Sequence, residues 1–301
     1  MTNTHKKPSK NKLIILLILG ILSLLIVLLD VFLTKDVVYF RDSRIYTGRI
    51  FPSFSTDDGN SIYSYQNQKV RISVHEYDEY PSHYFVADVW VRNPNYFLSA
   101  FSGNEFNTSD DSALTIAANH NALLAVNSDF NWGLVIRNGE LYSTEAWDLP
   151  MLVMYKNGSM KINYNQLYTA PEDLLASGAL NTWTFGPVLV DNYVRTVSEE
   201  EDDSYHPRTA LGYYSPKHYC FVVVDGRQSD YSSGMLLSDL GDLMVSLGCK
   251  IAYNFDGGAS SQMVANGNYL NRPCPSMNSE RLQRNMIVIT DSSQETSRQS
   301  G

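Results

Sequence analysis

The stretch "NFDGGASS" (254–261) carries the residue types best suited to chemistry in this chain. It places one carboxylate, two glycines and two hydroxyls directly after an apolar segment: Asp256, Gly257, Gly258, Ser260 and Ser261. A carboxylate can serve as a nucleophile or as a general base, and glycines let the backbone come close to a ligand. Serine hydroxyls and neighbouring backbone N–H groups can hold phosphate or sugar oxygens. We therefore expect the floor of a pocket for a polar ligand, with Asp256 as its reacting or orienting carboxylate.

Two other interpretations of this stretch stay open. The first is a plain glycine turn at the end of a strand. The second is a serine nucleophile, which in the hydrolase elbow requires the pattern G-x-S-x-G. Gln262 stands where the last glycine belongs, so the spacing disfavours a serine hydrolase.

Three more short polar clusters adjoin apolar segments. They supply His206, Arg208 and Thr209 in "HPRTALG", Asp225 and Arg227 in "VVVDGRQ", and Asn127 and Asp129 in "AVNSDFN". An arginine can bind phosphate through two parallel hydrogen bonds, and a histidine can carry a proton near neutral pH. Each cluster alone is equally compatible with an ion pair, a packed histidine or an Asx turn. Counted with the segment that ends at Asp256, three apolar segments each end in a short polar cluster, the others at Asp225 and Asn127, and together they indicate a shared site.

Residues 218–256 have the pattern of a β-α-β unit. Apolar runs at 218–225 and 251–255 flank "GMLLSDLGDLMVSLGCK" (234–250), in which apolar residues recur at helical spacing. A crossover helix favours parallel strands. We therefore expect both strands to end at one edge of the sheet, with Asp225 and Asp256 facing one crevice, where ligands of α/β sheets bind.

The rest of the body alternates between short strands, hairpins and a few helices. The patterns predict strands at 69–78 and 83–93, a helix at 112–121, and hairpins that turn at Asn138-Gly139 and Asn157-Gly158. Such a mixture predicts an α+β fold with mixed sheets. We place the folded domain at 68–292, after a stalk at 34–67 and before a disordered tail at 293–301.

The N-terminus has the pattern of a membrane anchor. The segment "LIILLILGILSLLIVLLDVFL" (13–33) contains a single charge, Asp30, and about 20 apolar residues span a bilayer. A cleaved signal peptide would have a shorter apolar core and a small-residue cleavage site. Four lysines and no acid precede the segment. The positive-inside rule then predicts a cytoplasmic tail at 1–12 and an extracellular body in a single-pass protein of the cell membrane.

The composition limits the kinds of partner. The chain has 301 residues, 44% of them hydrophobic, and a net charge of −9. Binding to a nucleic-acid backbone needs a basic face, so we expect no nucleic-acid partner. Zinc and EF-hand spacings are missing. We therefore predict no metal and no cofactor, although clustered Asp and Asn oxygens are ligands that Ca²⁺ accepts.

The cysteines are too few for a disulfide framework. The sequence contains Cys220, Cys249 and Cys274. We expect buried free thiols, and one pair could still form a disulfide outside the cell.

Taken in order, these motifs resemble the phosphodiester glycosidase family. The resemblance runs from about residue 110 to 290 and rests on "AVNSDF", "NTWTFGPVLV", "HPRTALG", "VVVDGRQSDYSSGMLLSDLGDLMVSLGC", "NFDGGASSQMV" and "NRPCPS". The chain departs from the usual family pattern at Ser128 and Ala259, where that pattern has glycine.

The resemblance implies hydrolysis of the bond between a sugar's anomeric carbon and a phosphodiester oxygen. The leaving group is a phosphate monoester, which is a weak base, so a strong general acid is less necessary than in ordinary glycosidases. The site then needs charge stabilisation for the phosphate, which suits Arg208 and the two serines, and a carboxylate at the anomeric carbon, Asp256 or Asp225. His206 would transfer a proton. The other candidates would line the substrate site: Asn127, Asp129, Thr209, Arg227, Gly257 and Gly258.

We therefore expect a membrane-anchored extracellular glycosidase that cleaves a sugar-1-phosphodiester bond in a surface glycan or teichoic-acid-like polymer. The lysine-rich tail, the single anchor and the few cysteines suit the surface of a Gram-positive bacterium. One alternative is a non-catalytic protein that binds or assembles surface polysaccharide on the same fold, in which Asp225 and Asp256 could face apart. Another is a cell-wall peptidase or esterase that acts through Ser260 or Ser261.

Overall fold

The computed structural model describes residues 38–41, 44–47, 61–200, 204–275 and 280–292. The chain divides into two compact units, residues 1–54 and 55–301. In the first unit, β1 (Val38–Arg41) pairs antiparallel with β2 (Arg44–Thr47). The other described elements belong to the second unit.

The expected membrane segment 13–33, the tail 1–12 and the tail 293–301 lie outside the described residues. Within the part of the chain that is described, no helix has the length and apolar character needed to cross a membrane.

An eight-stranded antiparallel sheet forms the centre of the second unit. Its strands follow the order β14-β13-β17-β15-β16-β5-β4-β3. Their bounds are β3 (Ser61–Gln66), β4 (Val70–Glu79), β5 (Ser82–Val91), β13 (Val188–Asp191), β14 (Val194–Arg195), β15 (Arg208–Ser215), β16 (His218–Asp225) and β17 (Ile251–Phe255). Residues 34–67, expected to be a stalk, thus include an edge strand, and the sheet starts at residue 61.

Both faces of the central strands are apolar. Successive side chains of a strand point to opposite faces of the sheet, and a strand such as β16 has apolar side chains at successive positions. In β16, Cys220 and Val222 belong to one core cluster, and Phe221 and Val223 belong to the other. Each face must therefore be covered. Helix α4 (Leu237–Ser246) covers one face through Leu240 and other apolar residues.

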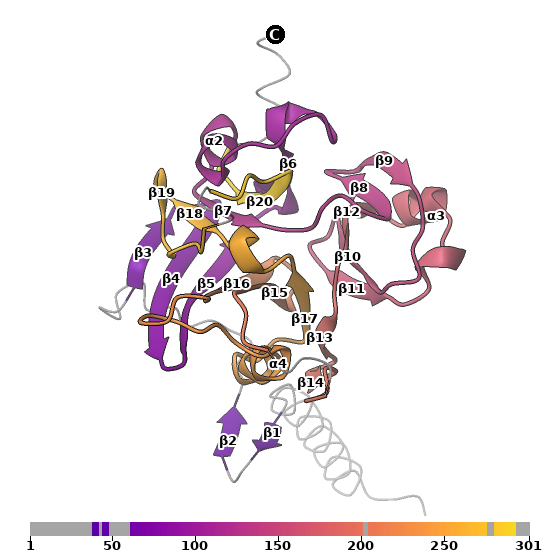
Figure 1. Cartoon of the computed structure of the whole chain (residues 1–301). Coiled ribbons are helices and arrows are strands. Elements are labelled where there is room, and N and C mark those ends of the chain that lie inside the picture. Colours follow the sequence, from indigo (N-terminus) through magenta and orange to yellow (C-terminus); the bar gives the residue numbers. More distant parts are fainter. Residues whose placement is uncertain (1–37, 42–43, 48–60, 201–203, 276–279, 293–301) are drawn as a thin grey trace, which may run out of the picture. The chain divides into compact units, whose positions relative to one another are not determined.

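A five-stranded sheet covers the opposite face. Its order is β19-β18-β7-β20-β6, with β6 (Phe97–Phe101), β7 (Leu124–Asn127), β18 (Met263–Ala265), β19 (Asn268–Tyr269) and β20 (Asn285–Ile289). Helix α2 (Ala113–Asn119) packs on its outer side through Ile116. The layers are therefore helix, sheet, sheet and helix (Figure 1).

A smaller sheet holds the middle of the chain. It has the order β11-β10-β12, and its neighbours are a β8–β9 hairpin and a short helix, α3. The bounds are β8 (Leu134–Arg137), β9 (Glu140–Thr144), β10 (Met151–Tyr155), β11 (Met160–Asn163), α3 (Pro171–Ala176) and β12 (Ala179–Thr184). Four short 3₁₀ turns complete the described elements: η1 (Pro94–Tyr96), η2 (Ser102–Asn104), η3 (Gln166–Tyr168) and η4 (Gly258–Ser260). Both predicted hairpins are present, at Asn138-Gly139 and Asn157-Gly158.

The predicted β-α-β unit is present with one correction. Strands β16 and β17 are parallel, since each is antiparallel to β15, but β15 lies between them. The segment that follows His206 thus inserts as a strand between the two parallel strands, a position that the sequence pattern did not predict. Arg208, at the start of β15, pairs with Val224 near the end of β16, so the β15 start and both strand ends meet at one edge. The fold as a whole is rich in β-structure with few helices, in agreement with the α+β expectation at that coarse level. The expectation of mixed sheets was wrong for the described residues, because neighbouring strands pair antiparallel throughout, as β15 does with both β16 and β17.

Candidate active site

A pocket of about 390 Å³ opens at this edge of the eight-stranded sheet. Its size falls in the range of small-molecule sites. The lining residues are Phe130, Phe185, His206, Pro207, Arg208, Arg227, Asn254, Phe255, Asp256, Gly257, Gly258, Ala259, Ser260 and Arg281. Seven of the residues predicted from sequence are among them: His206, Arg208, Arg227, Asp256, Gly257, Gly258 and Ser260.

Asp256 follows β17 directly and lies half-buried in the pocket wall. Its backbone N–H donates to the carbonyl of Ser128 at 3.1 Å, and its carbonyl accepts from Asn127 Nδ2 at 2.7 Å. Burial raises the pKa of its carboxyl, while a hydrogen bond from Ser260 and the charge of Arg281 act in the opposite direction. The fixed backbone and the shifted pKa suit an acid, base or nucleophile.

The two glycines after Asp256 allow a close approach to the protein's own backbone. A Cβ on Gly257 would lie 2.6 Å from the Pro207 carbonyl oxygen. Gly258 has a positive φ of 62°, and its N–H donates to the same oxygen at 2.9 Å. These contacts place the following 3₁₀ turn, and with it Ser260, at the pocket.

One side of the pocket is cationic. Arg227 Nη2 donates to His206 Nδ1 at 3.2 Å, which leaves Nε2 as the protonated nitrogen of a neutral imidazole. Burial and the nearby Arg227 charge lower the pKa of His206, which favours the neutral imidazole. Burial, with the same charge, lowers the pKa of Arg208 to about 10, and this guanidinium therefore stays charged. Its Nε donates to the Met235 carbonyl at 3.0 Å, which fixes its direction.

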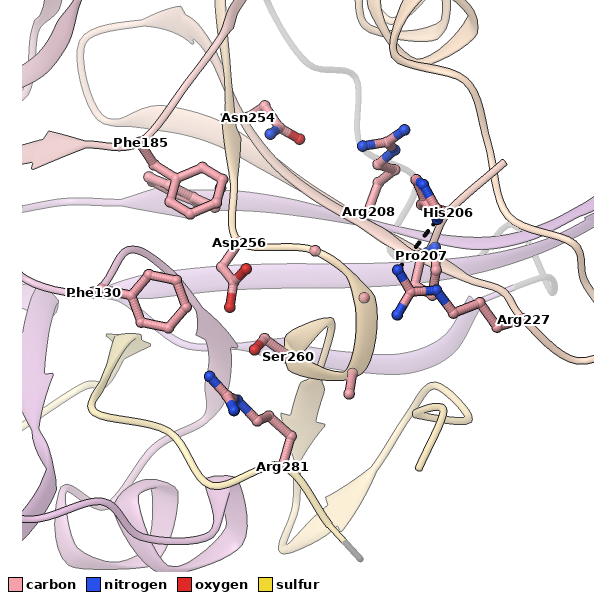
Figure 2. A pocket seen from close by; sticks show the side chains of 14 residues that line it. Phe130, Phe185, His206, Pro207, Arg208, Arg227, Asn254, Asp256, Ser260 and Arg281 are labelled. Atoms are coloured by element: carbon pink, nitrogen blue, oxygen red, sulfur yellow. Dashed lines mark hydrogen bonds between the residues drawn. The ribbon is translucent and has the colours of Figure 1, made fainter. Parts of the chain in front are cut away.

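The other side of the pocket is aromatic. Phe130 and Phe185 lie across Asp256 from His206, Arg208 and Arg227 (Figure 2). Their ring centroids are 6.0 Å apart. Arg281 lies 5.9 Å from the Phe130 ring centroid and approaches the carboxyl side of Asp256 (Figure 2).

Asn254 contributes an unused acceptor. Its Nδ2 donates to the Gly186 carbonyl at 2.8 Å. Its Oδ1 is buried and has no hydrogen-bond partner among the described residues. A buried unpaired acceptor costs free energy.

Three predicted site residues lie beneath the pocket and do not line it. Thr209 Oγ1 donates to Asn127 Oδ1 at 2.8 Å and lies 3.2 Å from Ser261 Oγ. Asn127 Oδ1 also accepts from the Gln262 N–H at 3.1 Å. All three side chains are buried, so they hold the Asp256 turn against the strands and do not themselves reach a ligand.

Asp225 also lies outside the pocket lining, which corrects the expectation that it faces the same crevice as Asp256. Its carboxyl accepts from Asn271 Nδ2 at 2.7 Å, the Arg272 N–H at 2.8 Å and the Tyr231 hydroxyl at 3.0 Å. Burial raises its pKa despite these partners. It therefore ties the loop that carries Arg227 to the segment around 271–272 and acts as a positioning residue.

Asp129 forms a fully buried ion pair. Its Oδ1 accepts from Arg137 Nη2 at 2.7 Å, and both side chains have no exposed area. Asp129 Oδ2 accepts from the Thr184 N–H at 3.1 Å. These bonds hold the loop that presents Phe130, so Asp129 supports the site from behind.

Seven lining residues were not among those predicted from sequence: Phe130, Phe185, Pro207, Asn254, Phe255, Ala259 and Arg281. All but Arg281 stand inside quoted motifs. The available signal was an aromatic residue after a polar cluster for Phe130 and Phe185, and an amide within an apolar strand for Asn254. Arg281 stands in "SERLQRN", which has no pattern that marks a site. Only the pairing of β20 with β6 and β7 brings this segment to the pocket.

Across the described residues, no group of three or more His, Cys, Asp and Glu side chains is arranged to hold a metal ion. The three cysteines are free and buried, with 3.5 Å between the sulfurs of Cys220 and Cys249.

Comparison with known proteins defines the class. The family model for phosphodiester glycosidases matches residues 112–290, which is more than half of the chain. The chain therefore belongs to the phosphodiester glycosidase family, whose name describes a glycosidase-type hydrolase.

Individual relatives agree with this assignment. The SPbeta prophage-derived uncharacterized protein YomE of Bacillus subtilis (strain 168) is 32% identical, over 54% of this chain and 27% of that protein. This chain thus spans about a quarter of that relative.

Two solved structures share the fold. The catalytic domain of zebrafish N-acetylglucosamine-1-phosphodiester alpha-N-acetylglucosaminidase, auto-inhibited by its pro-peptide, matches with a TM-score of 0.61 and 18% identity, over 77% of this chain and 87% of that one. A hypothetical protein from Synechocystis matches with a TM-score of 0.55 and 13% identity, over 74% and 62% of the two chains.

Proposed function

We propose that this protein is a membrane-anchored extracellular hydrolase that cleaves a sugar-1-phosphodiester bond in a surface glycan or teichoic-acid-like polymer. The observation that carries the proposal is the position of Asp256 between an aromatic side and a cationic side of one pocket (Figure 2). A glycosyl phosphodiester has the same polarity, with apolar C–H faces on its sugar and a negative charge on its phosphate.

The pocket chemistry fits the two halves of this substrate. The phosphate would lie against Arg208, Arg227 and the N–H group at Nε2 of the neutral His206 ring. These groups would stabilise the negative charge that grows on the leaving oxygen. The sugar would stack on Phe130 and Phe185. Asn254 Oδ1, which is buried and unpaired among the described residues, would accept a sugar hydroxyl.

Asp256 would then act at the anomeric carbon. The C1–O bond breaks, the electron pair leaves with the phosphate monoester, and the positive charge on the sugar is met by the carboxylate or by water that it deprotonates. Since the leaving group is a weak base, one carboxylate is sufficient where ordinary glycosidases need two. A pocket whose described lining contains one carboxylate, Asp256, is therefore compatible with this reaction.

A non-catalytic polysaccharide-binding protein is the second candidate. It is favoured by the placement of Asp225, which is fully engaged away from the pocket. The pKa of Asp256, raised by burial, favours the hydrolase, because a binding site gains nothing from a desolvated carboxylate beside an anion. The serine hydrolase alternative is weakened by the burial of Ser261 beneath the pocket.

The location rests on the N-terminal sequence. The apolar segment 13–33 and the lysines before it support a single-pass protein with its body outside the cell.

The test of the reaction is product analysis in ¹⁸O-water. The protein is incubated with N-acetylglucosamine-1-phosphodiesters and related sugar phosphodiesters, and the products are identified by mass spectrometry. We expect free sugar that carries ¹⁸O and an unlabelled phosphate monoester. Label in the phosphate would indicate a phosphodiesterase, and substrate binding without any product would favour the binding protein.

A further inference from the structure

Two tryptophans continue the aromatic side of the pocket toward solvent. We propose that Trp132 and Trp147 form a second sugar-binding subsite, which holds a neutral pyranose linked to the sugar in the pocket. This inference rests on the proposed function, because it extends the sugar half of the same substrate. The glycosyl group that the protein releases would then be a disaccharide or longer.

The aromatic rings form a continuous row. Phe130, which lines the pocket, lies 4.7 Å from Trp132 between ring centroids. Trp132 stacks on Trp147 at 5.2 Å with an interplanar angle of 28°. Trp132 is 42% exposed, so the row leads from the buried pocket to the surface. Contiguous exposed apolar surface, unlike a single exposed side chain, is typical of a binding site.

The backbone holds both tryptophans in place. The side chain of Gln166 is buried. Its Oε1 accepts hydrogen bonds from the backbone N–H of Trp147 at 2.9 Å and from the backbone N–H of Leu134 at 3.2 Å. In the residue before Trp132, the backbone N–H of Asn131 donates to Asp129 Oδ1 at 3.2 Å. Rings on a fixed backbone lose little conformational entropy when they bind a ligand.

The acidic residues near Trp147 in sequence disfavour an anionic sugar at this subsite. Glu145 and Asp148 flank Trp147 in sequence, and both are exposed. Carboxylates accept hydrogen bonds from sugar hydroxyls and repel phosphate. The phosphate would be held on the opposite side of Asp256, by Arg208 and Arg227 (Figure 2). The chain of sugars therefore extends over the tryptophans, away from the phosphate.

The test compares two substrates of different length, a methyl phosphodiester of N-acetylglucosamine and the matching diester of its β1,4-linked disaccharide. We expect wild type to prefer the disaccharide by roughly tenfold in kcat/KM, the effect of one good stacking contact. Trp132→Ala and Trp147→Ala should abolish this preference and leave kcat/KM for the shorter substrate unchanged. Trp132→Phe should retain part of it.

The matched control is Ile62→Ala. Ile62 has the same 42% exposure as Trp132 but lies on the edge strand β3, and its loss should leave the preference intact. A wild type without preference, or an equal loss on both substrates in the tryptophan variants, would overturn the subsite.

A direct binding measurement separates the subsite from the reaction. If wild type hydrolyses neither diester, the proposed function fails, and calorimetric titration with the disaccharide diester then tests the subsite alone. Weaker binding by Trp132→Ala than by wild type would still support it. Equal binding, or no binding by either protein, would overturn it.

Discussion

Asp256 and Asp225 follow apolar strands in the same way, yet their carboxyls differ in their surroundings. Asp225 accepts three hydrogen bonds in the protein interior. Asp256 lies half-buried at a pocket, and Ser260 and Arg281 oppose the effect of burial on its pKa. A carboxylate with all its partners in the protein orients a loop, whereas one that faces a pocket can react. The local sequence is Asp-Gly in both cases, so the sequence alone could not distinguish them.

Arg281 provides a test of the charge state of Asp256. Its positive charge lowers the carboxyl pKa, so Arg281→Gln should raise that pKa further. In the proposed reaction the ionised form is active, and the rate falls as the pH drops through this pKa. The acidic limb of the kcat/KM profile should therefore move to higher pH, as measured by initial rates from acidic to neutral pH.

Arg284 is the control for this variant. Arg284 forms a partly exposed pair with Asp110 at 3.0 Å, outside the pocket lining. Arg284→Gln should leave the acidic limb in place. If the acidic limb of Arg281→Gln is unchanged or moves to lower pH, Arg281 does not act on the reacting carboxyl.

At the scale of elements, the loop between β7 and β8 depends on a buried ion pair. Arg137 donates to Asp129 and to the carbonyl of Thr182 inside the protein. Removing one member of a buried pair leaves an uncompensated charge, which typically costs about 3–5 kcal/mol. Arg137→Met should therefore lower the free energy of unfolding by about this amount, as measured by urea denaturation.

The comparison is again with Arg284. Its pair with Asp110 is 39% and 42% exposed, and exposed pairs contribute about 0–1 kcal/mol. Arg284→Met should therefore lower the free energy of unfolding by an amount within that range. Similar losses in the two variants would mean that burial of the Arg137 pair has no special energetic role.

Local patterns predicted the regular elements better than their pairing. The Asn-Gly hairpins, the helix at 237–246 and the strands around it are encoded within a few residues. The insertion of β15 between β16 and β17 depends on long-range pairing, which periodicity does not encode. For the same reason the sequence marked His206, Arg208 and Asp256 but gave no sign of Arg281.

The layered arrangement of the second unit is what assembles the site. Asp256 follows a strand of the eight-stranded sheet, and Phe130 follows β7 of the five-stranded sheet. The Asn127 side chain, at the end of β7, joins the two sheets through its bond to the Asp256 carbonyl. The aromatic and cationic sides of the pocket therefore face each other only when both sheets are packed.

The proposed membrane anchor at residues 13–33 leads to a prediction for the whole chain. When the full-length protein is expressed in a Gram-positive host, it should remain in the membrane fraction after high-salt washing and dissolve in detergent. Protease added to cells without their wall should digest the body. A chain that lacks residues 1–37 should remain in the cytosol. Recovery of a shortened protein in the medium would indicate a cleaved signal peptide instead.

The most direct test of the account compares wild type with Asp256→Asn on a p-nitrophenyl phosphodiester of N-acetylglucosamine, with free sugar as the measured product. We predict that wild type releases the sugar and that kcat falls by about 10²–10⁴-fold in the variant, the range expected for loss of a catalytic acid or base. The variant should keep the wild-type melting temperature. Equal sugar release by the two proteins would contradict the role of Asp256, and no release by either, with binding retained, would make this a glycan-binding protein.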